Sequence, residues 1–125
     1  MTLTHVAYAT TWIIGIGIIF IGVRFLLVPR PSAVAFGVAV GPQAGDANAY
    51  LAVKGVRDIA SGLIAIALIL AATPQVLGWF MLSAAVIPIG DALIVLRYQG
   101  PKLAAYAIHG ATAAVMLVAA ALLLR

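Results

Sequence analysis

Ionisable side chains within apolar stretches are the residues of this sequence that could do chemistry. Such side chains are costly inside a membrane, so they usually face the interior of a helical bundle or a water-filled cavity. They are Arg24, Lys54, Arg57, Asp58, Asp91 and His109. Carboxylates and an imidazole can exchange protons with a bound molecule, and cations can stabilise negative charge on it. We therefore consider Asp58, Asp91 and His109 to be candidate catalytic residues.

One predicted helix presents several polar side chains on a single face. Spacings of i, i+3, i+4 and i+7 bring residues together on a helix, and they relate Lys54, Arg57, Asp58 and Ser61. The predicted ligand-binding residues are Arg24, Lys54, Arg57 and Ser61. Asp58 is expected to pair with Arg57 or Arg24, and Asp91 with Lys54 or Arg57. The alternative is that these ion pairs only fix the register of the helices, or that the long cationic side chains reach the headgroups.

His109 and the aspartates also raise the question of a metal or cofactor. An imidazole changes charge near neutral pH, so His109 is a candidate proton donor, although it could instead be a packed, hydrogen-bonded residue. Two aspartates and one histidine could ligate a metal, but the nearby cations disfavour one. We expect neither metal nor cofactor. The absence of cysteine excludes disulfides, thiolate catalysis and Cys-ligated metal.

The composition indicates that membrane helices position these residues. The chain has 125 residues, of which 66% are hydrophobic and 8% charged, and its mean hydropathy is +1.22. Soluble domains carry about 25% charged residues, and a soluble protein this apolar would expose aggregating patches. The length allows one domain, residues 1–125. The net charge of +4 is spread between apolar stretches, so we expect membrane lipids as partners and no nucleic acid.

The apolar stretches predict an all-α polytopic membrane protein, a bundle of four transmembrane helices. The predicted helices are about 6–28, 47–72, 76–97 and 102–124. Pro88 should kink the third helix. The apolar part of the second helix, 59–72, has only fourteen residues, so this helix spans only if its charged first half is immersed. Residues 32–45 are too short to span and are expected to form an interfacial or re-entrant loop.

Lys and Arg near the helix ends predict the orientation. Six basic residues share one side, and only Arg125 lies on the other; the six are Arg24, Arg30, Lys54, Arg57, Arg97 and Lys102. We therefore expect the plasma (inner) membrane, with this side in the cytoplasm and both termini outside. Residues 19–22 resemble 87–90, and 53–55 resemble 108–110, which leaves duplicated helical hairpins and chance as alternatives.

The stretch Lys54-Gly55-Val56-Arg57-Asp58, followed by Ser61-Gly62, resembles an uncharacterised bacterial family, a domain of unknown function. Members of that family are small integral membrane proteins with four helices. Their Lys-Gly-x-Arg-Asp motif opens the second helix, and His109 matches a histidine in their last helix. The layout is also loosely similar to DoxX-like proteins. The resemblance implies the four-helix fold and a shared polar site, and it implies no particular activity.

Three functions are compatible with these residues. The first is binding of a small anionic or lipid-like molecule, with isomerase-like or cyclase-like acid–base chemistry. In it, Asp58 or Asp91 is the base and His109 the acid. The second is small-molecule or proton-coupled transport, and the third is a structural or accessory membrane subunit. Because four short helices enclose little volume, we also expect a homo-oligomer, a dimer.

If the candidate site is functional, the variants Asp58→Asn, Asp91→Asn and His109→Ala are expected to fold. Expression level and the elution volume in detergent measure this. Loss of all three variants from the membrane would favour purely structural ion pairs.

Overall fold

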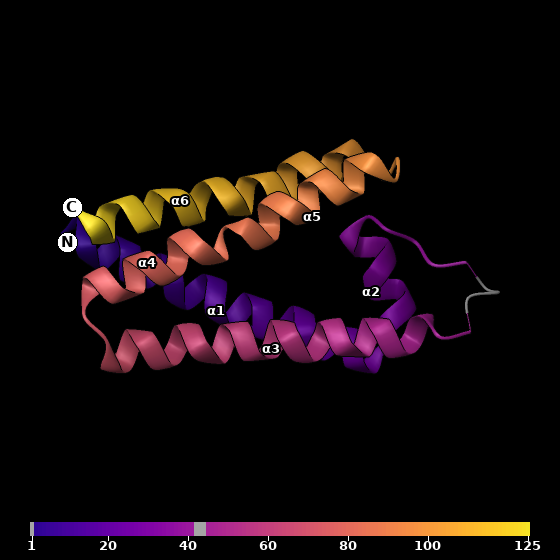
Figure 1. The fold of residues 1–125 in the computed structure, drawn as a ribbon, viewed down its shortest axis with the longest axis horizontal. Coiled ribbons are helices and arrows are strands. Elements are labelled where there is room, and N and C mark those ends of the chain that lie inside the picture. Colours follow the sequence, from indigo (N-terminus) through magenta and orange to yellow (C-terminus); the bar gives the residue numbers. More distant parts are fainter. Residues whose placement is uncertain (1, 42–44) are drawn as a thin grey trace.

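The structure is a computed structural model that describes residues 2–41 and 45–125 (Figure 1). Its helices are α1 (Leu3–Leu27), α2 (Pro29–Phe36), α3 (Ala47–Ala71), α4 (Pro74–Ala84), α5 (Val86–Arg97), the π-helical η1 (Ala104–Gly110) and α6 (Ala111–Leu124). The predicted all-α class is thus confirmed for the described residues. Both termini lie at the same end of the molecule (Figure 1).

Three helical segments are long and apolar enough to cross a bilayer, and they indicate a membrane protein. They are Leu3–Leu27, Pro74–Arg97 and Ala104–Leu124. Large apolar side chains are exposed along them, among them Ile13, Phe20, Leu93 and Leu103. The helix α3 has the same length as α1, 25 residues, but the charges of Lys54, Arg57 and Asp58 lie in its first half.

Glycines hold α1 and α3 close together. Gly22 faces Gly55, and Gly15 faces Gly62. A Cβ atom at Gly22 would lie 2.5 Å from the Gly55 carbonyl oxygen, and one at Gly62 would lie 2.5 Å from the Gly15 carbonyl oxygen. Small residues of this kind let the backbones of membrane helices approach. The contact places the charged part of α3 beside the end of α1.

A hydrophobic core joins α1 to α4 and α6 near the termini. Its buried members are Ala7, Leu77, Met81, Ala85, Met116, Ala119, Ala120 and Leu123. The molecule therefore consists of two helical hairpins, α1 with α3 and α4–α5 with η1–α6. They meet at the end that holds the termini and diverge toward the other end (Figure 1).

The α4–α5 rod is interrupted one turn before Pro88. Proline has no N–H to donate to the carbonyl of Ala84, and its ring crowds the preceding turn. The α-helix accordingly breaks at Ala85, between α4 and α5. This is the distortion that Pro88 predicts. Pro88 itself lies about one turn before Asp91, which belongs to α5.

The short helix α2 lies between the diverging hairpins (Figure 1). It contacts α1 and α3, while Phe36 and Val38 pack against Val95, Ala104 and Ala105 of the other hairpin. Gly37 ends α2 with a φ of 108°, which favours glycine, and a Cβ atom at Gly100 would collide with the Gly37 carbonyl oxygen. The segment expected to be interfacial or re-entrant, 32–45, thus includes the end of α2. Its residues 42–44 lie outside the described residues.

The variant Gly22→Ala is expected to destabilise the protein by about 1–3 kcal/mol, because the new methyl group would overlap the backbone of α3. The matched control is Gly17→Ala in the same helix, where a Cβ atom meets nothing within 4 Å. That control should gain up to about 1 kcal/mol from helix propensity. Reversible unfolding in mixed micelles measures both, and equal stability of the two variants would contradict the close α1–α3 contact.

Candidate functional site

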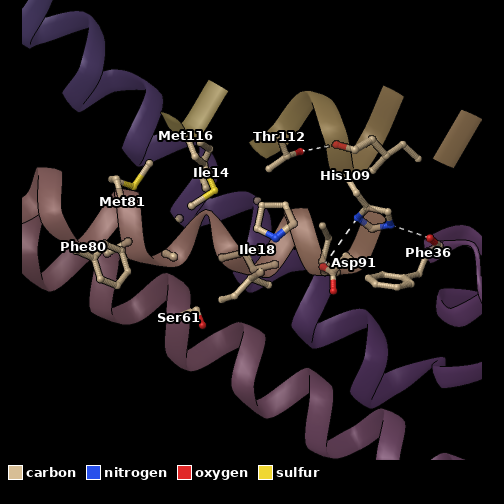
Figure 2. Close-up of a pocket in the computed structure, with 18 of the residues that line it drawn as sticks. Ile14, Ile18, Phe36, Ser61, Phe80, Met81, Asp91, His109, Thr112 and Met116 are labelled. Atoms are coloured by element: carbon tan, nitrogen blue, oxygen red, sulfur yellow. Dashed lines mark hydrogen bonds and ion pairs between the residues drawn. The ribbon is translucent and has the colours of Figure 1, made fainter. Parts of the chain in front are cut away.

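A cavity of about 240 Å³ lies between the two hairpins and is lined by α1 to α6 together with η1. Its two ends differ in chemistry. Figure 2 shows one end surrounded by Ile14, Phe80, Met81 and Met116, and the other end holding Asp91, His109 and Phe36. Lys54 and Ser61 also line the cavity from α3. The cavity is therefore amphipathic along its length.

The backbone that carries His109 departs from the regular α-helix. His109 belongs to η1, which is π-helical and continues directly into α6. Such segments are rare and occur frequently at functional sites. Where η1 passes into α6, Thr112 Oγ1 donates a hydrogen bond of 2.7 Å to the Ile108 carbonyl oxygen. The side chain of His109 projects from this segment into the cavity and is 7% exposed.

His109 makes one polar contact through each ring nitrogen (Figure 2). Its Nε2 lies 2.8 Å from the Phe36 carbonyl oxygen, and because a carbonyl can only accept, Nε2 carries a hydrogen and donates it. Its Nδ1 lies 3.9 Å from Asp91 Oδ2. This distance allows an ion pair when the imidazole is protonated and is too long for a direct hydrogen bond. An imidazole and a carboxyl group can each give or accept a proton, and both of these line the cavity.

Lys54 and Asp58 form an ion pair one turn apart on α3. Lys54 Nζ lies 2.5 Å from Asp58 Oδ2, and Asp58 is 7% exposed. The same ammonium group lies 4.4 Å from the centre of the Phe25 ring and 4.7 Å from that of Phe36, within cation–π range. The observed partner of Asp58 is thus Lys54 and differs from the expected arginines.

Asp91 also has a different partner from the one expected. It faces His109, and it forms no salt bridge with Lys54 or Arg57 among the described residues. Lys54 lines the same cavity as Asp91 and His109, and it carries Asp58 as its ion-pair partner. The two aspartates and Lys54 therefore belong to one electrostatic cluster with His109.

Arg24 and Arg57 lie outside the cavity. Both are exposed, and neither lines it. Successive residues of an α-helix project about 100° apart, so the inward position of Asp58 turns the adjacent Arg57 outward. Ser61, in contrast, lines the cavity, and its hydroxyl donates to the Arg57 carbonyl oxygen at 2.9 Å. The structure brings together Lys54, Asp58, Ser61, Asp91 and His109 from the predicted set.

Phe25 and Phe36 are the residues that the sequence analysis missed. Their rings meet edge to face, with centroids 6.2 Å apart. The Phe36 ring also lies 4.3 Å from the His109 ring. The sequence contains one signal for them: Phe25 lies near the end of α1, and Phe36 is the last residue of α2. Within residues 2–41 and 45–125, no group of three His, Cys, Asp or Glu side chains is placed to hold a metal ion.

The chain matches the model of one protein family over most of its length. A family model described as "Domain of unknown function (DUF4267)" matches residues 15–123. The chain belongs to this family. The predicted membership of an uncharacterised family is thus confirmed, and the match includes the whole polar end of the cavity of this DUF4267 protein. No curated protein and no solved structure matches the chain.

The single variants Lys54→Gln and Asp58→Asn are each expected to destabilise the DUF4267 protein, since each leaves a largely buried partner unpaired. The double variant should lose less than the sum, with a coupling of ~0.5–3 kcal/mol. Unfolding in mixed micelles measures the cycle. The exposed Arg57→Gln serves as control and should change stability by no more than about 0.5 kcal/mol. Strictly additive losses would show that the pair contributes nothing.

Proposed function

We propose that the protein crosses the membrane four times, with the charged first half of α3 immersed. The length of α3 and its close packing along α1, itself a candidate span, support this arrangement. Pairing between Lys54 and Asp58 reduces the cost of immersing these two charges. The basic residues near the helix ends favour the α2 end as the cytoplasmic side of a plasma membrane, which would leave both termini outside.

Within this arrangement we infer that the protein binds a small lipid-like molecule in the cavity between the hairpins. The observation that carries this proposal is the division of the cavity into an apolar end and a polar end (Figure 2). Its volume of about 240 Å³ is below the ~300–1,000 Å³ of pockets for drug-sized ligands, so the ligand is small. An anionic ligand is less favoured, because Lys54 is already paired with Asp58 and Asp91 adds another carboxyl group.

Acid–base chemistry on this ligand would use Asp91 and His109. A polar group of the ligand at that end would meet the carboxyl group of Asp91 and the imidazole of His109, which can exchange protons with it. The apolar walls would exclude water, so the proton would pass between the pair and the ligand. An isomerase-like step, which removes a proton at one atom and returns it at another, fits these two groups. Asp58 would act as a positioning residue that holds Lys54.

Filling the cavity tests the binding proposal. Gly17 lines the cavity and has no atom within 4 Å of a Cβ position, so Gly17→Leu should occupy ligand space without clashing at its Cβ atom. Gly90→Leu is the matched control, because Gly90 is equally open, lies in a helix and does not line the cavity. We expect Gly17→Leu to lose a co-purifying small lipophilic molecule that the wild type and Gly90→Leu retain. Mass spectrometry of organic extracts from protein purified in nanodiscs measures this.

Identical extracts from all three proteins would contradict binding in this cavity. Thermal unfolding of each protein is the accompanying measurement, because it shows whether Gly17→Leu has folded. A folded Gly17→Leu variant that retains the same molecule would place the binding site elsewhere.

A further inference from the structure

The polar end of the cavity contains one carboxyl group whose hydrogen-bonding capacity is unused. Asp91 makes no hydrogen bond to any described residue, and its only polar contact is the 3.9 Å approach to His109. Its side chain keeps 24% of its surface accessible and lines the cavity. A carboxylate placed in this way is an acceptor that lacks a donor.

The other polar side chains at this end are already engaged within the protein. The His109 ring donates to the Phe36 carbonyl oxygen, and the Thr112 hydroxyl donates to that of Ile108. The Ser61 hydroxyl and the Lys54 ammonium group likewise have their partners on α3. Asp91 is therefore the charged side chain at this end that has no hydrogen bond to a described residue.

The charges at this end also bear on the ligand. Lys54 and Asp58 form one ion pair. Among the described residues, Asp91 has no cationic partner closer than the His109 Nδ1 atom, 3.9 Å away. A carboxylate or phosphate that approached Asp91 would be repelled by its carboxyl group. A hydroxyl group would donate to Asp91 and leave the charge unchanged.

An amine would also be compatible with this carboxyl group. An ammonium group that enters beside Asp91 brings a positive charge and N–H donors to an acceptor that has no hydrogen bond to a described residue.

We propose that the polar end of the ligand is a hydrogen-bond donor, a hydroxyl or amino group, and that it binds the Asp91 carboxyl group. This inference rests on the proposed binding of a small lipid-like molecule in the same cavity. It specifies the class of that molecule as a short apolar chain that ends in a donor and carries no negative charge.

Three probes with the same chain and different ends test the inference: octanol, octylamine and octanoate. Binding is measured by titration calorimetry in phosphatidylcholine nanodiscs, and binding to Gly17→Leu is subtracted to remove partition into lipid. We expect octanol and octylamine to bind about tenfold or more tightly than octanoate, because each donates a hydrogen bond to a charged acceptor.

The variant Asp91→Asn separates the two end groups, since an amide still accepts a hydrogen bond but has no negative charge. It should weaken octylamine about tenfold and octanol less, while Gly90→Leu leaves both unchanged. Tighter binding of octanoate that Gly17→Leu abolishes would overturn the donor inference and leave the proposed function standing. If Gly17→Leu changes the binding of none of the probes, the proposed function itself fails.

Discussion

The ammonium group of Lys54 is the element on which the polar end of this molecule depends. A charge among apolar helices must be compensated where it lies, and here a carboxylate and two aromatic rings do so together. Phe25 belongs to α1 and Phe36 to α2, so compensation of one charge draws three helices to one point. The same Phe36 receives the His109 hydrogen bond through its carbonyl group. Lys54 and His109, from different hairpins, thereby both contact one aromatic residue.

The divergence of the two hairpins explains why a cavity exists in a chain this small. At the end that holds the termini, α1, α4 and α6 share a tight core of alanine, leucine and methionine side chains. Toward the other end, the glycine contacts keep α3 on α1, while the break at Ala85 and the π-helical η1 alter the path of the second hairpin. The short helix α2 fills only the far end of the space between the hairpins, where Phe36 packs against the second hairpin. The remaining space between the hairpins is the amphipathic cavity.

The arrangement bears on which of the compatible functions is favoured. Ion pairs that only fix helix register would be expected to satisfy one another, as Lys54 and Asp58 do. Asp91 does not follow this pattern, because its carboxyl group faces open space and a histidine that it does not reach by a hydrogen bond. A carboxyl group among apolar side chains is costly unless it gains a hydrogen-bond partner. A ligand with a donor group would supply that partner.

The sequence by itself determined the class of the protein, because long apolar stretches broken by proline and glycine form helices wherever the backbone must satisfy its own hydrogen bonds. It also determined which residues were candidates, since charges in such stretches are few. Only the tertiary structure decided how they are combined. Helical spacing placed Lys54, Arg57 and Asp58 on one broad face, but the close contact of α3 with α1 turned Asp58 inward and left Arg57 exposed. The roles of Phe25 and Phe36 depend on the path of α2 across the end of the bundle, and that path follows from packing between residues far apart in the chain.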